Sequence, residues 1–139
     1  MATVSIVKGT YSDPEIETLL APLGGMGRFV KKNDNVLLKV NLLSTKGPEK
    51  AVTTHPDFVR AVARAVRKAG AEPHIGDSPA GRFSKRYLKK AYTRSGLEDL
   101  AKEEEIPLNF DTGVKKLDIP KGKRLQRSPI CQYALKAEK

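Results

Sequence analysis

The sequence predicts an α/β fold, a mainly parallel sheet with helices on both of its faces. Residues 35–41 contain a nearly continuous apolar run, which is typical of a strand covered on both faces. An amphipathic helical pattern begins at Pro56 and continues to about Ala69, where Gly70 is suited to end it. A short strand pattern follows at residues 72–76. Strand, helix and strand in this order predict a parallel βαβ unit.

Two elements are expected before this unit. Residues 4–8 alternate in polarity and are rich in β-branched side chains, which predicts a first strand. Asp13 and Pro14 suit the N-cap and the first position of a short helix over residues 14–21. The glycines that follow are typical of a loop, because a phosphate-binding Gly-rich loop would follow a strand and not a helix.

Further helices and a strand are expected directly after the unit. Ser84 is suited to cap a helix that runs to about Arg94. A second short helix is expected at residues 97–104. Residues 107–110 have the pattern of a fourth strand.

The last part of the chain predicts a hairpin or two extended pieces, and then a helix. The extended pieces are residues 114–119 and 123–126, on either side of a Pro-Lys-Gly turn. Ser128 and Pro129 predict the start of a final helix through Leu135. No strand pattern follows that helix. We therefore expect residues 1–139 to be a single α/β domain that forms the N-terminal part of a larger fold.

The composition is that of a folded domain in a reducing compartment. The 139 residues are 39% hydrophobic and 30% charged, and they include no Trp, so aliphatic side chains must build most of the core. The single Cys131 excludes an internal disulfide and a metal cluster held only by cysteines of this chain. Because no signal-peptide pattern and no apolar run of about 20 residues is present, a cytoplasmic location and no membrane partner are expected.

The net charge of +10 favours anionic partners. Residues 82–94 contain six Lys or Arg and no acid, and residues 115–127 contain six against Asp118 alone. Solvated helix and loop faces are the favoured explanation of such runs, ahead of a dedicated nucleic-acid surface. Few aromatic residues are interleaved and no nucleic-acid-binding motif is present, so nucleic acid stays an alternative and not the favoured partner.

Three short segments are expected to meet at one edge of the sheet. The two strand ends and the helix start of a βαβ unit lie at the carboxyl edge, where open α/β folds bind ligands. The polar residues at these three places are Lys39, Asn41, Thr54, His55, Asp77 and Ser78. The sequence therefore predicts the place of a site more firmly than its chemistry.

Each of these residues has a structural interpretation beside the functional one. Lys39 either forms a salt bridge to Asp77 or contacts an anion that Asn41 helps to orient. Thr54 or the Thr before it is expected to cap the helix, although the free N–H groups there also suit an anion. His55 is either a neighbour of that cap or a functional group.

The second strand end has the same two interpretations. Asp77 is either a turn-making residue or a catalytic carboxylate. Ser78 would hold a phosphate or act as a nucleophile. No Gly-x-Ser-x-Gly elbow and no Gly-Lys-Ser/Thr loop is present, which disfavours a triad hydrolase and an NTPase.

Four motifs in order resemble the family known as domain of unknown function 362. They are VLLKVNLL at 36–43, AVTTHP at 51–56, GAE at 70–72 and IGDSP at 75–79. The chain departs from the family at Val40, where members usually have Pro, and the family continues beyond Lys139 into a segment with further motifs and cluster-binding cysteines. The resemblance implies a redox-associated, iron–sulfur-linked protein. It implies a [4Fe–4S] cluster only in longer members, so neither cofactor nor metal is expected in this chain.

The leading hypothesis is a domain that binds an anionic or phosphorylated ligand at the carboxyl edge of the sheet, with an anionic small molecule or an acidic redox protein as partner. One alternative is an enzyme domain in which Asp77 and His55 do acid–base chemistry. Another is a basic nucleic-acid-binding module that uses the helix within residues 82–94. No reaction, ligand identity or oligomeric state is assigned.

Overall fold

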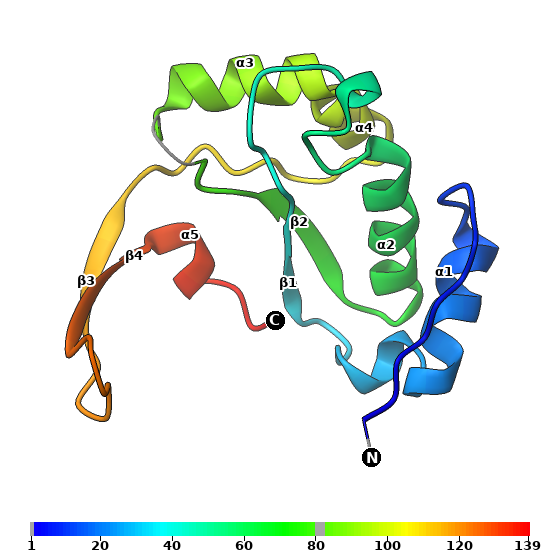
Figure 1. Cartoon of the computed structure of the whole chain (residues 1–139), viewed down its shortest axis with the longest axis horizontal. Helices are drawn as coiled ribbons and strands as arrows, with labels where there is room; N and C mark the ends of the chain where they lie inside the picture. Colours follow the sequence, from blue (N-terminus) through cyan, green and yellow to red (C-terminus); the bar gives the residue numbers. More distant parts are fainter. Residues whose placement is uncertain (1, 80–82) are drawn as a thin grey trace.

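A computed structural model describes residues 2–79 and 83–139, and it has the α/β class that the sequence predicts. Strands β1 (Asn35–Lys39) and β2 (Glu72–Gly76) lie at the centre, with helix α2 (Pro56–Lys68) on one side of them and the short helix α5 (Gln132–Leu135) on the other (Figure 1). Residues 80–82, part of the expected loop and of the first basic run, lie outside the described residues.

The β1–α2–β2 unit confirms the predicted βαβ arrangement. The two strands pair in parallel, with Lys39 opposite Gly76. Helix α2 begins at Pro56, and Gly70 just after it has a φ of 86°, the left-handed conformation that commonly ends a helix. The Thr54 N–H donates to the Asn41 carbonyl (3.0 Å), which holds the start of α2 beside the end of β1.

One edge of the strand pair is covered by residues 107–110. Leu108 forms an isolated parallel bridge with Ile75. The Ile75 N–H donates to the Pro107 carbonyl (2.9 Å), and the Asn109 N–H donates to the Ile75 carbonyl (2.8 Å). The predicted fourth strand is therefore present only as a single bridge, because the segment follows β2 for too few residues to form a ladder.

The other edge is covered by the end of the chain. The Leu37 N–H donates to the Lys139 carbonyl (2.8 Å), and the Glu138 N–H donates to the Asn35 carbonyl (2.9 Å). As the sequence indicates, no strand follows the last helix within the described residues, but two backbone hydrogen bonds still join the end of the chain to the open edge of β1.

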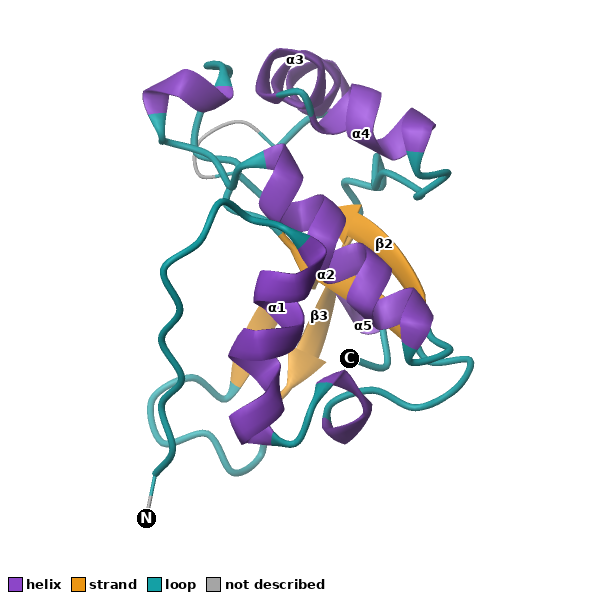
Figure 2. Cartoon of the chain, turned by 90° about the vertical axis from the view of Figure 1, so that its right-hand side faces the viewer, coloured by secondary structure: helices purple, strands orange, loops and turns teal. Residues whose placement is uncertain are grey.

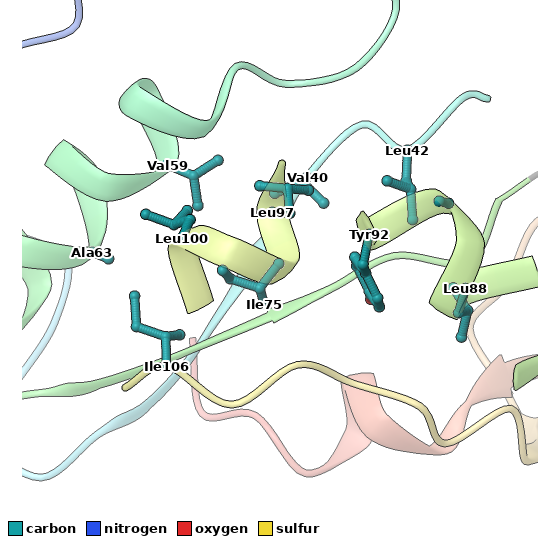
Figure 3. Packing of buried hydrophobic residues seen from close by; sticks show 11 residues of the cluster. Val40, Leu42, Val59, Ala63, Ile75, Leu88, Tyr92, Leu97, Leu100 and Ile106 are labelled. Carbon is teal, nitrogen blue, oxygen red and sulfur yellow. The ribbon is translucent and has the colours of Figure 1, made fainter. Parts of the chain in front are cut away.

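The largest apolar cluster lies between the strand pair, α2 and two further helices, α3 (Lys85–Ser95) and α4 (Leu97–Glu103). The Ser84 hydroxyl accepts from the Tyr87 N–H (3.3 Å), so the predicted cap of α3 is confirmed. Figure 3 shows how side chains from all these elements meet. The buried members are Val40, Leu42, Val59, Ala63, Ile75, Leu88, Ala91, Tyr92, Leu97, Leu100 and Ile106.

The predicted first helix is confirmed as α1 (Asp13–Leu20), which lies beside α2 (Figure 2). Its N-cap is Ser12 and not Asp13, and the Ser12 N–H donates to the Glu15 carboxylate (2.8 Å). Asp13 instead forms an ion pair with Arg64 of α2 (3.2 Å). Short 3-10 turns follow at Ala21–Leu23 and Met26–Arg28, and a third lies at Pro48–Lys50.

The strand predicted at residues 4–8 is wrong. Val4 and Ile6 are 79% and 88% exposed, and this segment pairs with none of the strands in the described chain. Strand propensity becomes a strand only where a ladder partner is available. Here Leu108 and Lys139 already occupy the two edges of the β1–β2 pair.

The predicted hairpin forms, but with a different second strand. Strands β3 (Val114–Asp118) and β4 (Arg127–Cys131) pair antiparallel, so the extended piece expected at residues 123–126 is wrong and the strand begins four residues later, at Arg127. The final helix forms and ends at Leu135 as predicted, but its expected start at Ser128 is wrong, because Ser128 and Pro129 belong to β4 and α5 begins at Gln132. A Ser-Pro pair suits a helix start, but Pro is equally tolerated in an edge strand, and both strands of a two-stranded ribbon are edges.

Candidate functional site

The carboxyl ends of β1 and β2 bring Lys39 and Asp77 together, as the βαβ order predicts. Lys39 is opposite Gly76 in the parallel register, so Asp77 begins just past the end of the ladder. The Lys39 Nζ lies 2.8 Å from Asp77 Oδ1. The salt bridge that the sequence left open as the structural interpretation therefore forms.

Asp77 is the buried member of this ion pair. Its side chain is only 7% exposed, whereas that of Lys39 is 66% exposed. Its second oxygen, Oδ2, accepts from the Leu42 N–H (3.0 Å). A buried carboxylate is stable only when its oxygens are paired, and here each one has a donor. Asp77 is therefore an acceptor that fixes both the Lys39 ammonium and the loop after β1.

The Lys39 ammonium is held at the edge of the site. Its hydrogen bond to Asp77 raises the pKa of Lys39 above the ordinary value, so the group is charged at neutral pH. An ammonium has three donors, and Asp77 is the acceptor that the structure shows for it. Asp77 thus holds the Lys39 ammonium in place, and the ammonium remains open to solvent, so its charge is available to a ligand.

Tyr133 of α5 completes the cluster, and the sequence interpretation missed it. Its side chain is 5% exposed. A Cβ placed on Gly76 would lie 3.0 Å from Tyr133 Cε2, so the tyrosine ring packs tightly against β2 at a position that leaves little room for a side chain. Its hydroxyl lies near the Ser78 side chain and near the charges of Asp77 and Lys39, all of which influence its pKa.

Burial raises the pKa of Tyr133, so its phenol remains protonated and can donate a hydrogen bond. No local pattern near Tyr133 points to this role. Tyr133 reaches the site because the chain returns to the sheet more than fifty residues after Asp77. Only the folded structure reveals this return.

A second tyrosine supports the site from the core. Tyr92 of α3 is completely buried, and its hydroxyl donates to the Asn109 carbonyl (3.1 Å). Burial raises the pKa of Tyr92, so its phenol stays protonated. It therefore anchors the segment at Asn109, which lies beside β2, without adding charge.

Asn41 and Thr54 form a backbone clamp rather than a pair of free polar groups. The Asn41 N–H donates to the Thr54 hydroxyl (2.8 Å), and the Asn41 side-chain amide donates to the Val52 carbonyl (3.5 Å). Thr54 is therefore not the cap of α2, as the sequence favoured. The N-cap is His55, whose Nδ1 accepts from the Asp57 N–H (3.3 Å).

His55 lies at a different hollow from the Lys39–Asp77 pair. Its ring stacks on Tyr11, with ring centroids 5.3 Å apart, and its Nδ1 lies 3.6 Å from the Asp57 carboxylate. The open hollow there, of about 320 Å³, is lined by Tyr11, Pro48, Ala51, Thr53, Thr54, His55 and Phe58. The structure thus joins Lys39, Asp77 and Ser78, and it gives His55 partners of its own.

The comparison with known families gives a single clear result. The model of the family described as Domain of unknown function (DUF362) matches residues 36–139. This chain belongs to that family. The match begins at β1 and therefore includes the whole β1–α2–β2 unit and every residue of the cluster around Asp77.

One relative is a protein of Synechocystis sp. that is described as thylakoid-associated. It is 55% identical to this chain over 65 residues, which are 47% of this chain and 20% of the relative. The matched stretch thus spans a fifth of that protein's length. No solved structure matches the chain.

The residues of this chain do not fit an iron–sulfur cluster. A [4Fe–4S] cluster takes about four thiolate ligands, and Cys131 supplies one. Within residues 2–79 and 83–139, no group of three or more His, Cys, Asp and Glu is arranged to hold a metal ion. Within the same residues, no helix is both long enough and apolar enough to cross a membrane.

Proposed function

We propose that this chain is a ligand-binding domain that holds a small anionic or phosphorylated ligand at the carboxyl edge of β1 and β2. The observation that carries the proposal is the Lys39–Asp77 ion pair, with its 2.8 Å contact, buried carboxylate and exposed ammonium. Asp77 orients the ammonium at the end of the sheet, so a ligand gains the charge without the entropy cost of ordering a free lysine.

Neutral donors beside the ammonium support an anion over a cation. Tyr133 keeps its proton because burial raises its pKa, and the exposed Ser78 hydroxyl lies near it. A phosphate or carboxylate would accept from both hydroxyls while its charge faces Lys39. The N-terminus of α2 does not add to this, since His55 caps it and Asp57 lies in its first turn.

The other hypotheses have weaker support. Acid–base chemistry by Asp77 and His55 would require the two groups to be close to each other. Asp77 instead binds Lys39 and the Leu42 N–H, and His55 binds the Asp57 N–H. A nucleic-acid surface on α3 would use Lys89, but this residue is paired with Glu98 (2.5 Å).

The redox association and the cytoplasmic location belong to the proposal as well. Because this chain lacks the thiolates for a cluster, any redox role is that of a ligand-binding domain beside a cluster-carrying segment or an acidic redox partner. The Synechocystis relative is described as thylakoid-associated, so we propose that this chain, too, works near a membrane.

The test is the affinity for inorganic phosphate, measured by isothermal calorimetry. We expect Lys39→Ala to weaken binding at least about tenfold, because a charge-assisted hydrogen bond is lost. The control is Lys90→Ala, because Lys90 lines a separate open hollow with Arg86 and Ser84, where two cations could also attract an anion. Equal losses from the two variants would contradict the proposal.

A second variant guards against loss of folding in Lys39→Ala. Tyr133→Phe keeps the ring that packs on Gly76 and leaves the Lys39–Asp77 pair intact, so it removes only the hydroxyl. We expect about fivefold weaker phosphate binding with an unchanged melting temperature. Phosphate affinity equal to that of the unmodified chain would exclude the phenol from the site.

A further inference from the structure

The β3–β4 hairpin stands away from the rest of the molecule. Figure 1 shows it extending from the body beyond α5, with its turn at the far end. Its five paired positions run from Val114 opposite Cys131 to Asp118 opposite Arg127. A lone two-stranded ribbon has little stability in water, so a protruding one of this kind is suited to contact something outside the chain.

The hairpin tip, residues 119–126, combines exposed aliphatic and basic side chains. Leu125 is 64% exposed and Ile119 is 37% exposed. The tip also carries three exposed cations, which are Lys121, Lys123 and Arg124. Exposure of large apolar side chains to water is unfavourable. Their exposure among cations at the end of the hairpin therefore indicates a binding surface.

The backbone of the hairpin tip is fixed. The Ile119 N–H donates to the Gln126 carbonyl (2.8 Å), and the Gly122 N–H donates to the Ile119 carbonyl (2.8 Å). A Cβ on Gly122 would lie 2.0 Å from the Leu125 carbonyl oxygen, so this turn requires glycine. Ile119 and Leu125 are therefore presented together at one end of the ribbon.

We propose that the hairpin tip docks on an anionic lipid surface. Ile119 and Leu125 enter the boundary between headgroups and acyl chains. Lys121, Lys123 and Arg124 contact the lipid phosphates, with their aliphatic stems along the apolar layer. Partition of apolar side chains together with attraction to anionic headgroups is how peripheral proteins bind membranes.

Charge complementarity favours this partner. Within the hairpin the one acid is Asp118, and it is paired with Arg127 (2.6 Å) at the base of the tip. The end of the arm is therefore purely cationic among its charged groups. Each Lys or Arg near an anionic bilayer strengthens binding several-fold, so three of them form a substantial attraction.

The side chains favour lipid over nucleic acid. Residues 114–127 include no aromatic residue, and single-stranded nucleic acid binds through stacking on aromatic rings. Exposed Leu and Ile gain nothing from phosphates, but they gain free energy from acyl chains. The expectation of no membrane partner rested on the lack of a spanning segment, and surface docking requires none. This inference does not depend on the ligand at Lys39.

The test is co-sedimentation of the full chain with vesicles of phosphatidylglycerol and phosphatidylcholine in equal amounts. We expect Lys121→Gln/Lys123→Gln/Arg124→Gln to weaken binding about 100-fold. The charge-matched control, Arg86→Gln/Lys90→Gln/Arg94→Gln on α3, removes the same three charges and should weaken it less than about threefold. Equal losses would mean attraction by net charge alone and would overturn the proposal.

The apolar half of the hairpin tip is tested separately. We expect Ile119→Ser/Leu125→Ser to weaken vesicle binding about 30-fold at unchanged net charge. If this variant binds vesicles normally while the basic triple variant loses vesicle and polyuridylate binding equally, the tip is a nucleic-acid surface and the proposal is wrong. Circular dichroism checks that both variants fold.

A reporter locates the contact directly. Because the chain has no Trp, Leu125→Trp places a single fluorophore at the hairpin tip. Its emission should shift to the blue on these vesicles and be quenched by brominated acyl chains. Leu43→Trp is the control, since Leu43 is 57% exposed and lies far along the chain from the tip. No shift for Leu125→Trp, or the same shift for both, would overturn the proposal.

Discussion

The β1–α2–β2 unit and the β3–β4 hairpin carry positive charge in two different ways. In the unit, Lys39 is fixed by Asp77, whose side chain is 7% exposed. In the hairpin, Arg127 and Asp118 form an ion pair in which both side chains are more than 60% exposed. A charge oriented by a buried partner acts at one point, whereas exposed charges are screened within about 8–10 Å and attract any anionic surface. The same residue types thus form a charge fixed by a buried partner in one region and an exposed ion pair in the other.

The largest difference between the two regions should be in stability. Ile75 of β2 is completely buried, and we expect Ile75→Ala to lower the free energy of unfolding by about 3 kcal/mol because it leaves a cavity. Leu125→Ala, at a 64% exposed position of the hairpin tip, should change it by less than about 0.5 kcal/mol. Urea unfolding measures both. Similar losses would mean that the hairpin is part of the same cooperative core.

The next effect concerns the ion pair itself. Lys39→Met leaves the Asp77 carboxylate buried with the Leu42 N–H as its remaining partner, so we expect a loss of about 2 kcal/mol in the free energy of unfolding. Lys39→Met/Asp77→Asn should recover about 1 kcal/mol, because a neutral amide oxygen still accepts from Leu42. Urea unfolding at neutral pH gives the comparison. If the double variant is no more stable than Lys39→Met, the loss in the single variant does not come from the unpaired Asp77 carboxylate.

Acid should lower the stability of the α3–α4 region before it affects the β3–β4 hairpin. The pKa of Glu98 is lowered to about 2, first by Lys89 and then by Thr93 and Lys102. A lowered folded-state pKa contributes stability above the unfolded value of about 4.5, and this stability is lost as pH falls toward 2. We expect Glu98→Gln to flatten the decline in melting temperature over this range. Glu72→Gln, at an exposed position, is the control. A parallel decline in Glu98→Gln and the unmodified chain would rule this contribution out.

The smallest effect is expected from the exposed ion pair of the hairpin. Arg127→Gln should change the free energy of unfolding by less than about 0.5 kcal/mol, since an exposed pair gains little in water. Hydrogen exchange of the hairpin amides would reveal any larger local effect of the Arg127–Asp118 ion pair. Complete loss of protection across β3 and β4 in this variant would show that the pair holds the ribbon closed.

The two regions also differ in what could be predicted from the sequence. The β1–α2–β2 unit follows from local signals, such as an apolar run, a strong helical pattern and Gly70, and its parallel topology then places Lys39 beside Asp77. The strand at residues 4–8 and the helix from Ser128 failed because their outcome depends on which sheet edges are free and on which segment pairs with β3. Local patterns do not contain that information.

The same limit applies to the proposed site. That Lys39 and Asp77 meet could be predicted because a βαβ order has one carboxyl edge. Tyr133 was missed because it reaches Gly76 only through the return of the chain to β1, where Lys139 bonds to Leu37. His55 was assigned to the site from its place at the helix start, but its ring stacks on Tyr11 instead.

The most direct test of the central claim is a map of amide chemical-shift changes during titration with inorganic phosphate. A ligand at the carboxyl edge should produce saturable shifts at Leu42, Asp77, Ser78 and Tyr133, which come from three separate parts of the chain and meet only at this site. These shifts should persist at moderate salt, because the ammonium of Lys39 is held in place by a buried carboxylate. Shifts confined to α3 or to the hairpin tip, and lost as salt is added, would contradict the claim.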